Sequence, residues 1–116
     1  MTIIKYFYKK STIKRKVLDI KDDIKTLIKQ NCTENIFIMH YGAYDIDPRH
    51  LVYWICVKTD KMKAELAGNE KLNYNLRQVL TKNEYPKDAH DNVFIGFESQ
   101  ETVDRESKGN WWVHFK

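Results

Sequence analysis

The chain has 116 residues, of which 42% are hydrophobic and 31% charged, proportions typical of a folded globular domain rather than a disordered chain. This length predicts one domain, residues 1–116, with one core. No apolar run reaches the roughly 18–20 residues that a membrane span needs, and lysines interrupt the apolar start, which argues against a signal peptide. Two cysteines do not make a disulfide scaffold. We therefore expect a cytoplasmic protein with no membrane partner.

The positive charge is concentrated in the N-terminal part of the chain. Residues 1–31 contain nine Lys or Arg against three Asp, a net charge of +6, whereas the whole chain carries +4. The remaining residues are therefore slightly acidic. This asymmetry suggests either a charged partner or the solvated face of one amphipathic helix.

The first long element is predicted to be a helix. Residues 2–10 are compatible with a short strand or a first helical turn, and of these the helix is favoured. From Ser11 or Thr12, either of which can cap a helix, apolar residues recur at helical spacing over about 18 residues. The stripe consists of Ile13, Val17, Ile20, Ile24, Leu27 and Ile28.

Residues 36–41 and 51–57 predict an antiparallel hairpin. Residues 51–57 carry no charge, Gly or Pro and are apolar on both strand faces, which predicts a central strand covered on both sides. Trp54→Asp is therefore expected to unfold the domain. In the connecting turn, Asp47 can bond its own backbone and Pro48 presets φ.

The rest of the chain predicts three helices and two more strands. Thr59 is expected to cap a helix that Gly68 ends, and a second helix runs from Asn69 to about Asn83. After a loop at residues 84–92 come a strand at 93–97, a helix at 100–106 capped by Ser99, and a last strand at 111–115. The expected fold is a single α+β domain with a mainly antiparallel sheet of four or more strands, covered by helices.

Catalytic and metal-binding patterns are weak. His40 and His50, with Asp45 and Asp47, could converge on a metal ion, but their spacing matches no compact ligand pattern. Cys56 lies in the middle of a predicted strand, where thiols are usually buried.

Other catalytic patterns give no better support. The loop at residues 88–91 could hold an acid–base pair, although its residues are also ordinary for loops. The Asp-x-Lys pairs at 19–21 and 23–25 lie on a helix, where their side chains would diverge. No phosphate-binding glycine loop is present in the sequence. We expect no enzyme, no cofactor and no metal.

Trp111 and Trp112 offer a different kind of site. On a strand, successive residues point to opposite faces, so one of them is expected to be exposed. An exposed Trp is typical of a protein interface, or of a platform on which nucleic-acid bases stack. Nucleic-acid binding through the basic N-terminal helix and an exposed Trp is therefore the second hypothesis.

Residues 47–60 (DPRHLVYWICVKTD), 99–105 (SQETVDR) and 109–112 (GNWW) resemble segments of small bacterial immunity proteins, which are encoded beside contact-dependent inhibition and other polymorphic toxins. The resemblance covers about a third of the chain. It implies a non-catalytic protein that binds one cognate toxin domain and blocks its active site. It carries over no site residues, because such proteins share no common site.

The first functional hypothesis is accordingly a protein-binding module whose partner is a toxin domain. We predict its binding surface in the turn at residues 45–49 and the loop at residues 84–91, because loops tolerate variation where a scaffold does not. The predicted contact residues are Tyr44, Asp45, Asp47, Arg49, Tyr85, Asp88, His90 and Asp91.

Overall fold

The computed structural model describes residues 3–115, and its sheet is built around the strand predicted to be central. The strands are β1 (Phe37–Tyr41), β2 (Val52–Val57) and β3 (Phe94–Ser99), in the order β1-β2-β3. The α+β class and the central position of β2 are thus confirmed.

The prediction of a mainly antiparallel sheet with at least four strands is wrong. The sheet has three strands and is mixed: β1 pairs with β2 antiparallel, whereas β2 pairs with β3 parallel. A parallel pair needs a long crossover. Here α2 (Asp60–Ala67), α3 (Glu70–Lys82) and the 3-10 helix η3 (Lys87–Asn92) provide it.

The predicted fourth strand is instead a short helix, α5 (Trp111–His114). Lys108 and Gly109 adopt positive φ angles and end α4 (Gln100–Ser107), and the Asn110 side chain then accepts a hydrogen bond from the Val113 N–H. In this helix Trp111 and Phe115 lie on one side, against the sheet. A strand would also have turned Val113 toward the sheet, but Val113 is 53% exposed.

The helix caps predicted at Thr12, Thr59 and Ser99 are confirmed, and Asn69, where a helix was predicted to begin, is also a cap. Thr12 caps α1 (Ile13–Lys29), Thr59 caps α2, Asn69 caps α3 and Ser99 caps α4, each accepting a hydrogen bond from a backbone N–H in the first turn. The ambiguous start forms a 3-10 helix, η1 (Ile3–Phe7), and a second one, η2 (Pro48–His50), precedes β2. Residue 2 lies outside the described part.

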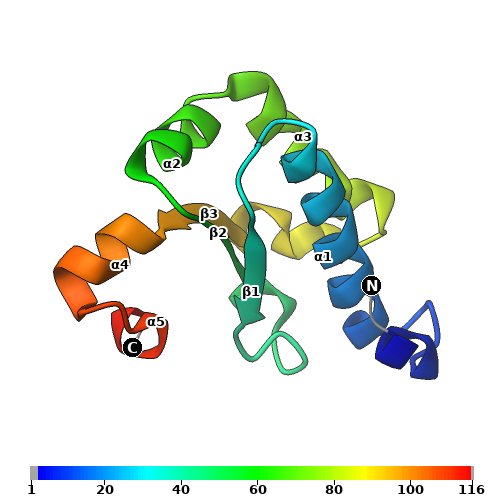
Figure 1. Ribbon diagram of the computed structural model, residues 1–116. Helices are drawn as coiled ribbons and strands as arrows, with labels where there is room; N and C mark the ends of the chain where they lie inside the picture. The colour runs from blue at the N-terminus through cyan, green and yellow to red at the C-terminus, as the bar shows by residue number, and fades with distance from the viewer. Residues whose placement is uncertain (1–2, 116) are drawn as a thin grey trace.

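The main core lies between one face of the sheet and helices α1 and α3 (Figure 1). Tyr53 and Ile55 of β2 are fully buried there with Val17 and Ile24 of α1, and the Tyr53 hydroxyl donates to the Val17 carbonyl over 2.5 Å. Helices α4 and α5 lie on the other side of the sheet. No helix among residues 3–115 has the length and hydrophobicity to span a bilayer.

Candidate functional site

The second face of the sheet, which α5 covers only in part, carries exposed aromatic side chains. The Phe37 and Trp111 rings lie 5.0 Å apart, and the Trp54 ring lies 4.7 Å from Phe115 and 4.8 Å from Phe94. Exposed fractions are 44% for Phe37, 41% for Tyr41, 44% for Phe94 and 75% for Trp112. We call this set the aromatic face: Phe37, Tyr41, Trp54, Phe94, Trp111, Trp112 and Phe115.

A groove of about 320 Å³ runs along the aromatic face beside α5. It is lined by Met39, His40, Tyr41, Trp111, Trp112 and Phe115. The Trp54 indole N–H donates to the Tyr41 hydroxyl over 2.9 Å, so the polar atoms of these two rings satisfy each other. What the groove offers a ligand is therefore chiefly apolar surface.

Sequence reasoning expected one exposed Trp but missed the aromatic face as a site. Part of the aromatic face could have been predicted, because alternate residues of a strand share one side and Phe37, Met39 and Tyr41 alternate along β1. The run at residues 51–57, being apolar on both sides, predicted two covered faces. The structure corrects this: Val52 and Trp54 are only half-buried.

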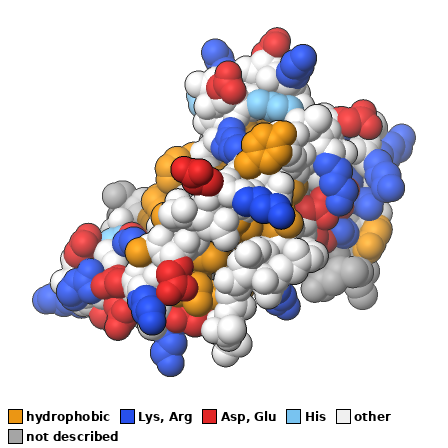
Figure 2. Space-filling view, turned by 90° about the horizontal axis from the view of Figure 1, so that it is seen from above, with side chains coloured by type: hydrophobic (Ala, Val, Ile, Leu, Met, Phe, Trp, Pro, Cys, Tyr) orange, Lys and Arg blue, Asp and Glu red, His pale blue; other side chains and the backbone are white. Residues whose placement is uncertain are grey.

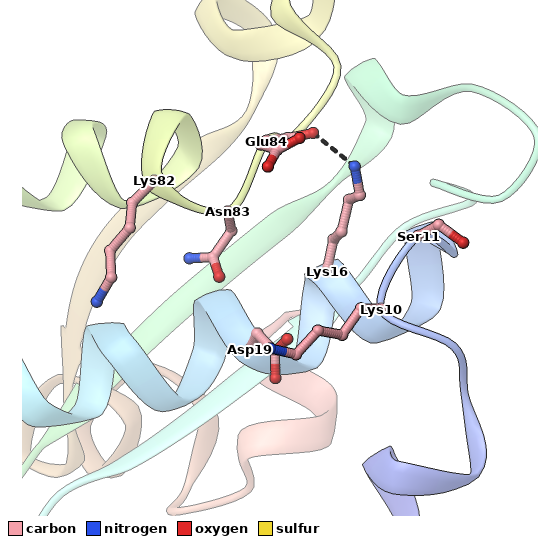
Figure 3. A pocket seen from close by; sticks show the side chains of 7 residues that line it. All are labelled: Lys10, Ser11, Lys16, Asp19, Lys82, Asn83 and Glu84. Atoms are coloured by element: carbon pink, nitrogen blue, oxygen red, sulfur yellow. Dashed lines mark hydrogen bonds between the residues drawn. The ribbon is translucent and has the colours of Figure 1, made fainter.

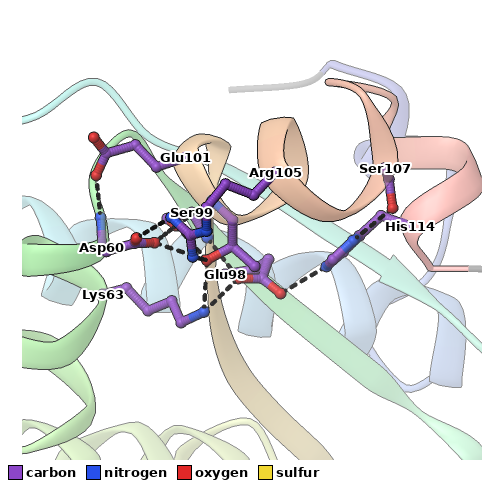
Figure 4. A network of polar contacts seen from close by, with 9 residues as sticks. Asp60, Lys63, Glu98, Ser99, Glu101, Arg105, Ser107 and His114 are labelled. Atoms are coloured by element: carbon purple, nitrogen blue, oxygen red, sulfur yellow. Dashed lines mark hydrogen bonds and ion pairs between the residues drawn. The ribbon is translucent and has the colours of Figure 1, made fainter.

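A network of polar side chains fixes α4 and α5 to the end of β3 (Figure 4). Glu98 is 8% exposed and accepts hydrogen bonds from Lys63 over 2.7 Å and from the Ser99 N–H over 2.9 Å, and it lies 2.8 Å from His114 Nε2. The other imidazole nitrogen lies 3.0 Å from the Ser107 hydroxyl. These contacts position α5, and with it the aromatic face.

A second part of the network joins α2 to α4. Asp60 accepts hydrogen bonds from Ser99 over 2.5 Å and Thr102 over 2.7 Å and pairs with Arg105 over 2.5 Å. These bonds hold the pKa of Asp60 well below its usual range. The carboxylate therefore stays charged and locks the two helices together.

The chain Ser107–His114–Glu98 has the composition of a hydrolytic triad but a different geometry. In such triads the acid usually bonds Nδ1 and the nucleophile Nε2, whereas here the serine meets Nδ1. The carboxylate is also neutralised by Lys63. We assign the chain a structural role.

Glu98→Gln is expected to destabilise the protein by about 2 kcal/mol at neutral pH. Burial alone raises the pKa of Glu98, but hydrogen bonds from Lys63, His114 and Ser99 and the charge of Lys63 outweigh it, so the pKa lies below the ordinary 4.5. A lowered folded-state pKa contributes stability above pH 4.5 that is lost as the pH falls through the folded value. Urea unfolding between pH 3 and 7 measures this.

The Glu98→Gln variant should lose less stability on acidification than the wild type. Glu65→Gln, on the exposed part of α2, is the matched control and should follow the wild-type curve. An unchanged pH dependence in Glu98→Gln would contradict the assigned role.

The turn and the loop predicted to bind a partner lie next to each other. The Tyr85 hydroxyl donates to the Pro48 carbonyl over 2.6 Å, which joins η2 to the loop before η3. Tyr85 itself is 2% exposed, so it supports this surface from inside. His90 Nε2 lies 2.7 Å from the Tyr85 carbonyl.

The remaining predicted contact residues differ in how accessible they are. Asp45, Arg49, Asp88 and Asp91 are exposed, whereas Tyr44 is half-buried and packs against the core. Asp47 accepts three hydrogen bonds from the Arg49 side chain and one from its N–H, and these bonds hold the pKa of Asp47 well below its usual range.

The residues considered as metal ligands do not lie close enough together to form a site. His50 lies 3.9 Å from Asp47, but the His40 ring lies 6.0 Å from Tyr53 and 6.3 Å from Tyr44 on the core side of β1. Within residues 3–115 no group of three or more His, Cys, Asp or Glu side chains is arranged to hold a metal ion.

The two thiols are free and differ in accessibility. Cys56 is fully buried, and burial, with the charge of Glu98, raises its pKa to about 12, whereas Cys32 is half-buried. We expect a thiol reagent such as DTNB to label one cysteine per native chain and two in urea. Cys32→Ser should abolish the native reaction, and labelling that persists would contradict the placement of Cys56.

A charged pocket lies between the start of α1 and the end of α3, with a volume of about 400 Å³ (Figure 3). Lys16 donates to the Glu84 carbonyl over 2.8 Å, and Lys82 pairs with Asp23. The pocket mixes lysines with carboxylates and indicates no particular ligand. Its lining is Lys10, Ser11, Lys16, Asp19, Lys82, Asn83 and Glu84.

The two features required by the nucleic-acid hypothesis lie on opposite faces of the sheet. Helix α1 packs on the core face, whereas Trp112 belongs to α5 on the aromatic face. On the face that Figure 2 shows, basic side chains are interspersed with acidic ones. This arrangement does not favour the hypothesis.

The chain was compared with protein-family models, curated proteins and solved structures, and no match was found in any of the three.

Proposed function

We propose that this protein is a non-catalytic binding protein whose partner is another protein, and that this partner is a toxin domain that it neutralises. The observation that carries the proposal is the aromatic face. Contiguous exposed apolar surface marks interaction sites, and Trp and Tyr are enriched among the residues that contribute most binding energy.

The construction of the aromatic face supports a recognition role. A rigid sheet presents the rings of Phe37 and Tyr41, while the Glu98 network holds α5 in place beside them. Little conformational entropy is lost when such a preorganised surface binds. The toxin as partner rests on the resemblance of residues 47–60, 99–105 and 109–112 to immunity proteins.

The test is affinity capture from the native host with three variants of matched design. Tyr41→Ala, Trp112→Ala should lose the partner, because both rings line the groove on the aromatic face. Tyr74→Ala, which removes an aromatic ring that is 65% exposed on α3, should retain it. Arg49→Ala, Asp88→Ala tests the turn and loop surface.

The outcomes separate the claims. If no specific protein is captured, the binding role is wrong. If the partner is lost only in the Arg49→Ala, Asp88→Ala variant, the binding surface lies in the turn and loop instead of the aromatic face. For the toxin claim, the captured protein should arrest growth when expressed alone in the host, and co-expression of the wild type but not the Trp112 variant should restore growth. A captured protein without toxicity overturns that part.

A further inference from the structure

β1 is an unprotected edge of the sheet. It pairs only with β2, and no strand within residues 3–115 pairs with its outer edge. The other edge strand, β3, has α2 packed against it. Edge strands are usually protected by charges, Pro or bulges, yet Phe37–Tyr41 reads FIMHY, without a charged residue or Pro.

A groove lies on each side of β1. On the core side, a groove of about 270 Å³ separates β1 from α1, and Leu18, Lys21, Lys25 and Ile38 are among its lining residues. On the other side is the apolar groove with Trp112 and Phe115. Successive side chains of a strand added along β1 would point alternately into these two grooves.

The groove on the core side is lined by three lysines, Lys5, Lys21 and Lys25, and by one carboxylate, Asp22, so its lining carries a net positive charge. Lys21 and Lys25 are one helical turn apart, a repulsive spacing, and neither forms an ion pair among the described residues. Lys5 also lines this groove, but it is bonded to Asp19 and Asp22. Burial lowers the pKa of Lys21, with Lys25 adding to this effect and Asp22 opposing it.

His40 also faces the core side of β1, although it does not line this groove. Its Nδ1 is buried and is the one buried side-chain nitrogen or oxygen within residues 3–115 that lacks a hydrogen-bond partner. Burial, together with the charge of Lys21, lowers the pKa of His40. An acidic side chain placed in this groove would pair with Lys21, which is half-buried, and would offset its repulsion from the exposed Lys25. Unlike charges attract more strongly where solvent is partly excluded.

We propose that the outer edge of β1 binds an extended segment of the partner protein as a fourth strand, in which acidic side chains facing Lys21 and Lys25 alternate with apolar side chains facing Trp112 and Phe115. This mode is β-strand addition, in which backbone hydrogen bonds supply affinity and alternate side-chain pockets supply specificity. It rests on the proposed function, a protein partner. A second copy of β1 does not meet these requirements, because residues 37–41 contain no carboxylate.

The test uses a displayed library of random nine-residue peptides selected on the immobilised full chain. We expect the enriched sequences to carry Asp or Glu at alternate positions with apolar residues between them. A synthetic peptide of the best sequence should slow amide exchange at residues 37–41. Its affinity, measured by fluorescence anisotropy, should fall at least about tenfold in Lys21→Glu, Lys25→Glu.

Two controls separate charge recognition from damage to the fold. Lys9→Glu, Lys61→Glu makes the same change in net charge at exposed positions that do not line the groove and should bind normally. The same peptide with Lys in place of each acidic residue should bind Lys21→Glu, Lys25→Glu better than the wild type, a rescue that misfolding cannot produce.

The following results would each overturn the inference. Absence of enriched peptides, enrichment without acidic alternation, or protection outside β1 removes the strand-addition mode. Self-association with protection of β1, seen by analytical ultracentrifugation, replaces the partner with a second copy. The proposed function fails separately, because it depends on capture of a protein through Tyr41 and Trp112 and not on peptide binding at the β1 edge.

Discussion

Ile55→Asp is expected to unfold the protein at room temperature. Ile55 is fully buried at the centre of β2, between Ile38 on β1 and Phe97 on β3. The substitution removes a core side chain and places a carboxylate among apolar groups with no cationic partner. The combined cost is more than about 5 kcal/mol, comparable to the whole stability of a small domain. Circular dichroism and thermal unfolding measure it.

Trp54→Asp, one residue away on the opposite face, is the matched control. Contrary to the expectation from the sequence, it should remain folded, because Trp54 is not fully buried. Trp54 is half-buried and open to solvent beside Tyr41, so the new carboxylate can stay hydrated. The lost ring contacts with Phe94 and Phe115 should cost about 2–3 kcal/mol. If Ile55→Asp melted as high as Trp54→Asp, the assignment of the core face would be wrong.

Gly42→Ala should destabilise the protein by about 2–3 kcal/mol. Gly42 ends β1 with φ at +106°, a conformation that side chains with a Cβ rarely adopt, and an added Cβ would lie 1.9 Å from the His50 carbonyl oxygen. Because that neighbour is backbone, the connection between β1 and β2 must shift to accept it. Urea unfolding of the variant measures the loss.

Gly68→Ala is the control for this change. Gly68 has φ at −85° at the end of α2, and an added Cβ would meet the Ala64 carbonyl oxygen at 3.3 Å. The effect should stay within about 1 kcal/mol, because the gain in chain stiffness offsets the tight contact. Equal losses in the two variants would show that the close approach of Gly42 to His50 is not a constraint on the fold.

Some residues of the aromatic face are brought together by a local pattern, and others only by tertiary packing. Alternation along β1 could have shown that Phe37, Met39 and Tyr41 share a face. Nothing local indicates that Trp111 and Phe115, about 70 residues later in the sequence, pack beside them. The same holds for Lys21 and His40, which only the packing of α1 on the sheet brings together.

Most of the local elements follow from short-range patterns in the sequence. Thr12, Thr59, Asn69 and Ser99 began helices where predicted, because a cap needs only a side-chain oxygen and the backbone N–H groups of the next turn. The uncharged run at residues 51–57 became the middle strand for an equally local reason: its composition suits a buried strand.

The direction of β3 and the packing of the last residues depend on tertiary contacts. Whether β3 joined β2 parallel or antiparallel depended on the path of α2 and α3, and whether residues 111–115 formed a strand or a helix depended on what they packed against. Aromatic residues suit either state, so the choice fell to contacts between distant residues. The Asn110 cap is a local signal for this helical turn. Only tertiary packing, however, placed Trp111 and Phe115 on the sheet and left Trp112 in solvent.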